Sequence, residues 1–103
     1  MKKVYLVMTQ YSTDDCDGID TLAFDTYSKA VKHFKEQIEN EISYDGYWPV
    51  NAFENGVLQH NYELDCSPNY TDDEEHELWW YLHCKLDWYL HTNIELRILE
   101  IEN

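Results

Sequence analysis

The chain has 103 residues, which is the size of one domain, so we expect a single domain over residues 1–103. Hydrophobic residues make up 44% and aromatic residues 16%, which excludes an acidic disordered tail. The 21 Asp and Glu outnumber the 7 Lys and Arg, and the net charge of −14 argues against direct binding to nucleic acids or anionic membranes.

The first part of the chain predicts two strands. Residues 2–11 carry apolar side chains at both even and odd positions, which predicts a strand that is buried on both faces. Residues 12–20 are rich in Asp and contain a glycine, which indicates an acidic loop. Residues 21–24 predict a short second strand that runs antiparallel to the first.

Residues 26–42 predict the main helix. Asp25 or Thr26 can cap its first turn. Apolar side chains then recur with a period of 3.6 residues and form one stripe: Tyr27, Ala30, Val31, Phe34, Ile38 and Ile42. We expect this stripe to pack against a sheet.

The middle of the chain predicts a hairpin followed by a strand. Pro49 makes residues 44–53 a loop or an edge strand, because proline cannot donate a ladder hydrogen bond. Asn55 and Gly56 form the dipeptide that a tight hairpin turn prefers. Polar and apolar residues then alternate over residues 58–66, which predicts a further strand.

Apolar residues occupy most even positions between residues 78 and 98. A helix does not sustain alternation over this length, so we predict two strands, joined near residues 85–87 or near residues 91–93. The same alternation predicts that Trp79 faces outward and that Trp80 lies in the core.

A helix over residues 72–84 is the structural alternative, because Thr71 and Glu74 match a capping box. Taken together, the elements predict an α+β domain with the order β-β-α and then further strands. In this fold, a mostly antiparallel sheet packs one face against the helix at residues 26–42.

Two patterns resemble metal sites, and both lack ligands. In a calcium loop with Gly18 at the sixth position, the first and twelfth positions would be Thr13 and Phe24, where acidic residues are required. A zinc site is suggested by His76, His83, Cys84 and His91. No Cys-x-x-Cys or His-x-x-x-His pair is present, and His83 and Cys84 would point to opposite faces of a strand. We therefore expect no metal and no other cofactor.

We expect no enzymatic activity. The 3 glycines are isolated, so there is no glycine-rich phosphate loop, and no local motif pairs a cysteine with a histidine. The odd count of 3 cysteines and the absence of a signal-peptide pattern predict reduced thiols and a cytoplasmic location. No apolar run approaches the roughly 20 residues that cross a bilayer.

The acidic residues are concentrated in a region that adjoins a tryptophan pair. Between Glu36 and Cys84 there are 12 acidic residues and no Lys or Arg. A solubilising surface is one interpretation. Because a field of one sign costs stability and tryptophan is enriched in binding hot spots, we expect instead that the acids attract a basic partner and that aromatic rings anchor it. The candidate partner-binding residues are Asp14, Asp15, Asp17, Asp20, Asp72, Asp73, Glu74, Glu75, Glu77 and Trp79.

Three stretches resemble a set of small acidic proteins of Firmicutes phages and mobile elements: "MKKVYLV", "AFDTYSKAVKHF" and "TNIELRILEIE". They cover about a third of the chain and contain no site motif, so the resemblance assigns no functional residue. Some of these proteins are anti-CRISPR inhibitors of type II RNA-guided nucleases. The resemblance therefore implies a viral protein that acts in the host bacterial cytosol to evade defence.

The hypothesis that follows is a non-enzymatic inhibitor. Its carboxylates would replace phosphates in the basic nucleic-acid channel of a type II CRISPR nuclease and block guide RNA or target DNA. The alternative is an antitoxin-like or regulatory binding module for another basic protein. A small nuclease or metal-dependent enzyme is the third possibility, and binding without turnover would exclude it.

Overall fold

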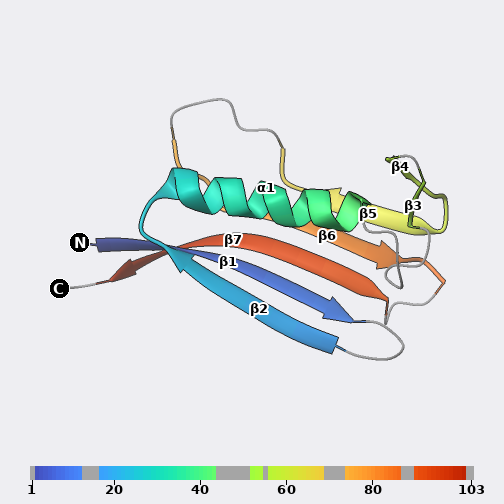
Figure 1. Cartoon of the computed structure of the whole chain (residues 1–103), viewed down its shortest axis with the longest axis horizontal. Helices are drawn as coiled ribbons and strands as arrows, with labels where there is room; N and C mark the ends of the chain where they lie inside the picture. The colour runs from blue at the N-terminus through green and yellow to red at the C-terminus, as the bar shows by residue number, and fades with distance from the viewer. Residues whose placement is uncertain are drawn as a thin grey trace.

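The computed structural model describes residues 2–12, 17–43, 52–54, 56–68, 74–86 and 90–101. In this part of the chain a five-stranded antiparallel sheet, with strand order β2-β1-β7-β6-β5, is covered on one face by a single helix (Figure 1). The elements are β1 (Lys2–Ser12), β2 (Asp17–Phe24), α1 (Tyr27–Ser43), β3 (Phe53–Glu54), β4 (Val57–Leu58), β5 (Tyr62–Cys66), β6 (Leu78–Cys84) and β7 (His91–Ile101). This arrangement confirms the predicted α+β class and the order β-β-α followed by further strands.

Helix α1 begins and ends within one residue of the predicted bounds. The hydroxyl of Thr26 accepts a hydrogen bond from the Lys29 backbone N–H at 3.3 Å, so Thr26 is the N-cap. The Asp25 carboxylate instead pairs with the Lys29 ammonium group at 3.1 Å. Ala30 and Phe34 on the apolar stripe are fully buried against the sheet. The cap and the 3.6-residue period therefore place the helix correctly.

Strand β2 is longer than predicted, because it begins at Asp17 and not at residue 21. β1 is long enough to pair along the whole of β2, from Tyr5 opposite Phe24 to Ser12 opposite Asp17. Gly18 leaves room for the Tyr11 side chain, since a Cβ there would lie 2.6 Å from the Tyr11 hydroxyl oxygen. The expectation of an acidic loop over residues 12–20 is therefore wrong for residues 17–20, and residues 13–16 lie outside the described part.

Residues 78–84 are a strand, and residues 74–77 are not helical, so the helical alternative for residues 72–84 is wrong over its described part. β6 pairs with β5 on one side and with β7 on the other. These ladders satisfy its backbone groups, and the even-numbered side chains enter the core. The connection to β7 begins after Cys84, close to the first of the two predicted positions.

The hairpin at Gly56 is confirmed. β3 and β4 pair with Glu54 opposite Val57, and Gly56 has a φ of 80°, which glycine adopts without steric cost. The strand predicted over residues 58–66 is interrupted after Leu58. A turn follows, in which the Tyr62 N–H donates to the Gln59 carbonyl at 3.1 Å, and the chain then re-enters the sheet as β5.

The two faces of the sheet differ in what covers them. The core lies between the sheet and α1 and contains Tyr5, Val7, Ala30, Phe34, Ala52, Trp80, Leu82, Ile94 and Leu96. On β1, Tyr5 and Val7 point into this core, whereas Leu6 and Met8 point to the other face and are half-buried. The expectation that the first strand is buried on both faces is therefore wrong, since no described element packs on the second face. No helix among the described residues is long and apolar enough to cross a membrane.

Candidate functional site

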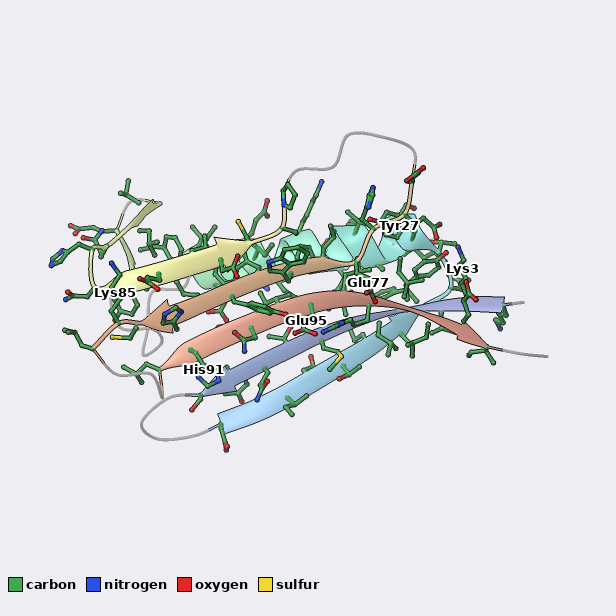
Figure 2. All side chains as sticks on the ribbon, turned by 180° about the vertical axis from the view of Figure 1, so that it is seen from behind. Lys3, Tyr27, Glu77, Lys85, His91 and Glu95 are labelled. Carbon is green, nitrogen blue, oxygen red and sulfur yellow. The ribbon has the colours of Figure 1, made fainter. Side chains whose placement is uncertain are left out.

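The face of the sheet that α1 leaves uncovered carries a combination of acidic and aromatic side chains. We call it the open face, and Figure 2 shows it toward the viewer, with Glu77, Glu95 and His91 labelled. Its central residues are Leu6 and Met8 of β1, Glu95 and Arg97 of β7, Trp79 and Tyr81 of β6, and Glu63 and Asp65 of β5. Strand alternation brings these side chains to one face, and most of them are in register with others of the set on neighbouring strands.

A hydrogen-bonded network occupies the middle of the open face. The Tyr81 hydroxyl donates to Glu95 Oε1 at 2.5 Å, and Arg97 Nε donates to Glu95 Oε2 at 2.8 Å. Both oxygens of the Glu95 carboxylate are therefore held, which orders three neighbouring side chains from two strands. An ordered charged surface loses less side-chain entropy when a partner binds.

Burial raises the pKa of Glu95, but the hydrogen bonds from Tyr81 and Arg97 outweigh it, so the pKa is lowered overall. Burial, reinforced by the hydrogen bond to Glu95, raises the pKa of Tyr81 to about 12. The hydrogen bond to Glu95 and the charge of that carboxylate raise the pKa of Arg97. The network is therefore one carboxylate, one neutral phenol and one guanidinium at neutral pH.

Trp79 and two exposed acids flank this network on the side of β5. Trp79 is half-buried, and its indole N–H lies 3.5 Å from Asp65 Oδ1. Next along the face, His83 Nε2 lies 3.1 Å from Glu63 Oε2, and the Glu63 side chain is 57% exposed. The indole ring thus lies beside carboxylates that face solvent. This is an arrangement that can hold a Lys or Arg side chain by charge and by cation–π contact.

Strands β5, β6 and β7 together carry a negative charge. Among the residues of β5, β6 and β7, Arg97 is the only Lys or Arg, whereas the acids are Glu63, Asp65, Glu95 and Glu100. Arg97 is itself bound to Glu95 and lies 4.0 Å from Glu77. Its charge is consequently neutralised within the protein, and the exposed carboxylates of β5 dominate the field.

Three of the predicted acids lie just before β6, and two of them serve the fold. Glu75 Oε1 accepts a hydrogen bond from the Tyr5 hydroxyl at 2.8 Å and lies 3.5 Å from the Lys3 ammonium group. The hydrogen bond to Glu75 raises the pKa of the buried Tyr5 phenol. Glu77 Oε2 accepts the backbone N–H of Ile98 at 3.0 Å, just before the point where β6 begins. Charge reversal of Glu75 and Glu77 would therefore remove bonds within the fold as well as change the surface charge.

Glu74 lies elsewhere, at a hollow between α1 and the β5–β6 side of the sheet. This hollow has a volume of about 260 Å³ and an apolar floor that includes Phe34 and Trp80. Lys35 also lines it, so a basic side chain lies in the same hollow as this acid. Glu74 is therefore placed away from the open face.

The second predicted acidic segment is at the opposite edge of the sheet. Asp17 and Asp20 are on β2, which β1 and β7 separate from β6. Their registers, with Ser12 and Thr9 respectively, place them on opposite faces of β2. The structure therefore does not join the two predicted segments into one patch. Asp14, Asp15, Asp72 and Asp73 lie outside the described residues.

Sequence reasoning missed the three residues of the network, Tyr81, Glu95 and Arg97, and the two acids that flank it, Glu63 and Asp65. The alternation over residues 78–98 placed Glu95 and Arg97 on the outward set, but it could not say which strand lies beside them. The strand order, with β7 between β1 and β6, is what brings Tyr81 to Glu95.

Within the described residues, no group of three or more His, Cys, Asp and Glu side chains is placed to hold a metal ion. Of the two described cysteines, Cys84 is buried and Cys66 is exposed, and both are free thiols. Comparison of the chain with protein-family models, curated proteins and solved structures found no match.

Proposed function

We propose that this protein is a non-enzymatic inhibitor that binds a basic nucleic-acid-binding surface of a partner protein through the open face. The observation that carries the proposal is the position of Trp79 and Tyr81 beside the exposed carboxylates of β5, on a face that no described element covers. Arginine and lysine side chains that normally contact phosphates would pair with these carboxylates. The aromatic rings would supply apolar contact area beneath them.

The specific partner that we propose is an RNA-guided type II CRISPR nuclease, as the resemblance to acidic phage proteins implies. Such a nuclease holds its guide–target heteroduplex in a positively charged channel. An acidic protein in this channel would compete with guide RNA or target DNA by mass action. Inhibition would then require binding alone and no catalytic turnover.

The test is a DNA-cleavage assay with purified type II nucleases from Firmicutes hosts, with and without the protein. The informative variant is the double substitution Glu63→Gln and Asp65→Asn, which removes two exposed charges from the open face. We expect it to slow association with the nuclease by roughly tenfold or more at low salt, because exposed charges mainly set the association rate. Raising the salt should weaken the wild-type complex, since screening shortens the reach of these charges to about 10 Å at 0.1 M.

The matched control is the double substitution Glu36→Gln and Glu39→Gln on the exposed side of α1. It changes the net charge by the same amount on the opposite layer of the molecule, so it should leave association nearly unchanged. Equal effects of the two double variants would reject the open face as the contact surface. Unchanged guide loading and cleavage with the wild-type protein would reject the inhibitor proposal itself. A purified basic partner that binds no nucleic acid would favour the antitoxin-like or regulatory alternative.

A further inference from the structure

Strand β2 is an unprotected edge of the sheet. It is the terminal strand in the order β2-β1-β7-β6-β5, and nothing in the described part of the chain pairs with its outer side. Figure 1 shows it extending beyond the area that α1 covers. Every second residue of an edge strand directs its backbone N–H and C=O groups away from the sheet, where another chain can pair with them.

Two of the usual devices that protect an edge, proline and lysine, are absent from β2, and its charged residues are the acids Asp17 and Asp20. Its 8 residues contain no proline and no lysine, and its register with β1 runs without a bulge. The other terminal strand, β5, has only 5 residues and is followed closely by Pro68. β2 is therefore the edge on which an added strand would form the longer ladder.

The side chains of β2 provide both apolar and charged contacts. Ile19 is 68% exposed on the open face, and Leu22 is 44% exposed on the other face. Asp17 and Asp20 are exposed as well, and the strand has no basic residue to balance them. At its loop end the Tyr11 ring lies close to Gly18 on the neighbouring strand.

We propose that β2 binds an extended, basic segment of a partner protein, which adds to the sheet as a sixth strand. Backbone hydrogen bonds would supply affinity, and Lys or Arg side chains of the added segment would lie beside Asp17 and Asp20. A second copy of this chain does not suit the β2 edge as the added strand. Two β2 strands would bring four carboxylates together between molecules that each carry a charge of −14.

This inference does not rest on the function proposed above, because β2 and the carboxylates of β5 lie at opposite edges of the sheet. The probe is a synthetic peptide of arginine and valine, as long as β2, with arginines on both faces of the extended strand, since Asp17 and Asp20 lie on opposite faces. Two comparison peptides are a version with glutamate in place of arginine, and a version with prolines that cannot form a ladder. Affinity is measured by fluorescence anisotropy, and contacts are located by amide hydrogen exchange and NMR chemical shifts.

We expect the arginine peptide to bind and to slow hydrogen exchange at outward-facing amides of β2, whereas the other two peptides bind much more weakly. Ile19→Lys should lower the affinity by about tenfold or more. The added ammonium group repels the arginine side chains of the peptide, and an apolar contact is lost. The matched control is Leu86→Lys, which makes the same kind of change at a side chain that is 79% exposed outside the sheet ladders.

Three outcomes would overturn the proposal. One is binding of the arginine peptide with protection only on β5, β6 and β7, which would reject the β2 edge while leaving the open face intact. Another is equal binding of the proline peptide, which would mean attraction by charge without strand addition. The third is a dimer in sedimentation with protected β2 amides, which would identify a second copy as the occupant. Loss of nuclease inhibition in the Glu63→Gln and Asp65→Asn variant would not bear on any of these results.

Discussion

Trp79 and Trp80 are neighbours on β6, and they lie in opposite environments. The Trp80 ring is 4% exposed and stacks with Phe53, with ring centroids 6.2 Å apart, in the layer between the sheet and α1. Trp79 lies on the open face beside Asp65. The same strands therefore build a stabilising apolar layer with one set of residues and a charged surface with the alternate set.

The two faces differ in how their side chains are held. On the open face, both oxygens of Glu95 are bound by side chains from two strands. The covered face holds the fold together by apolar contact area, whereas the open face is ordered by hydrogen bonds to charged groups. The following changes test this difference, from the largest expected effect to the smallest.

Replacing each tryptophan by alanine gives the sharpest contrast between the faces. Trp80→Ala leaves a cavity in the core and should lower the free energy of unfolding by about 3–5 kcal/mol. Trp79→Ala should cost about 1 kcal/mol, because its ring is only partly removed from water. Chemical denaturation followed by circular dichroism measures both. Equal losses would contradict the assignment of the two faces.

Glu95→Gln tests whether charge orders the open face. The substitution weakens two hydrogen bonds to a carboxylate, and we expect a loss of about 1–3 kcal/mol at neutral pH. The pKa of Glu95 is lowered in the folded protein, so its contribution is present above the unfolded pKa and is lost as pH falls through the folded value. The wild type should therefore lose more stability than Glu95→Gln between neutral and acid pH. Parallel pH profiles would contradict this account.

Tyr81→Phe tests the same network by removing the hydroxyl that donates to Glu95. At neutral pH the loss of one hydrogen bond should cost about 1 kcal/mol. Because the pKa of Tyr81 is raised from 10.0 to about 12, its contribution is present below pH 10 and is lost as pH rises toward 12. The phenylalanine variant should show a shallower alkaline loss of stability in denaturation experiments. Tyr62 also has a raised pKa, so Tyr62→Phe is the comparison that shows how much of the loss belongs to Tyr81.

The smallest effect is expected at Glu77, which links the acidic segment to the sheet. Glu77→Ala removes the acceptor of the exposed Ile98 N–H and should cost about 0.5 kcal/mol. Glu77→Gln keeps an acceptor oxygen and should cost less, although it removes the same charge. Hydrogen exchange at the Ile98 amide should accelerate in the alanine variant. The same exchange rate in both variants would show that the bond does not contribute.

The structure brings only some of the predicted site residues together, and the reason lies in strand pairing. Trp79 faces outward as predicted, because alternation along one strand is a local property. Glu75 and Glu77 are instead bound to Tyr5, Lys3 and the β7 backbone, which are distant in sequence. The partners of an acidic side chain depend on which strand lies beside it, and a count of charges does not contain that information.

The amino-acid sequence by itself determined the class of the fold, the helix, the hairpin at Gly56 and the alternation of β6 and β7. Each of these depends on neighbours within a few residues: a cap, a period or a turn conformation. Only the tertiary structure decided the length of β2, the strand order and the network around Glu95. These depend on β1 offering a partner along its whole length and on β7 lying between β1 and β6. Register joins residues far apart in the chain, so its consequences appear only when the sheet is assembled.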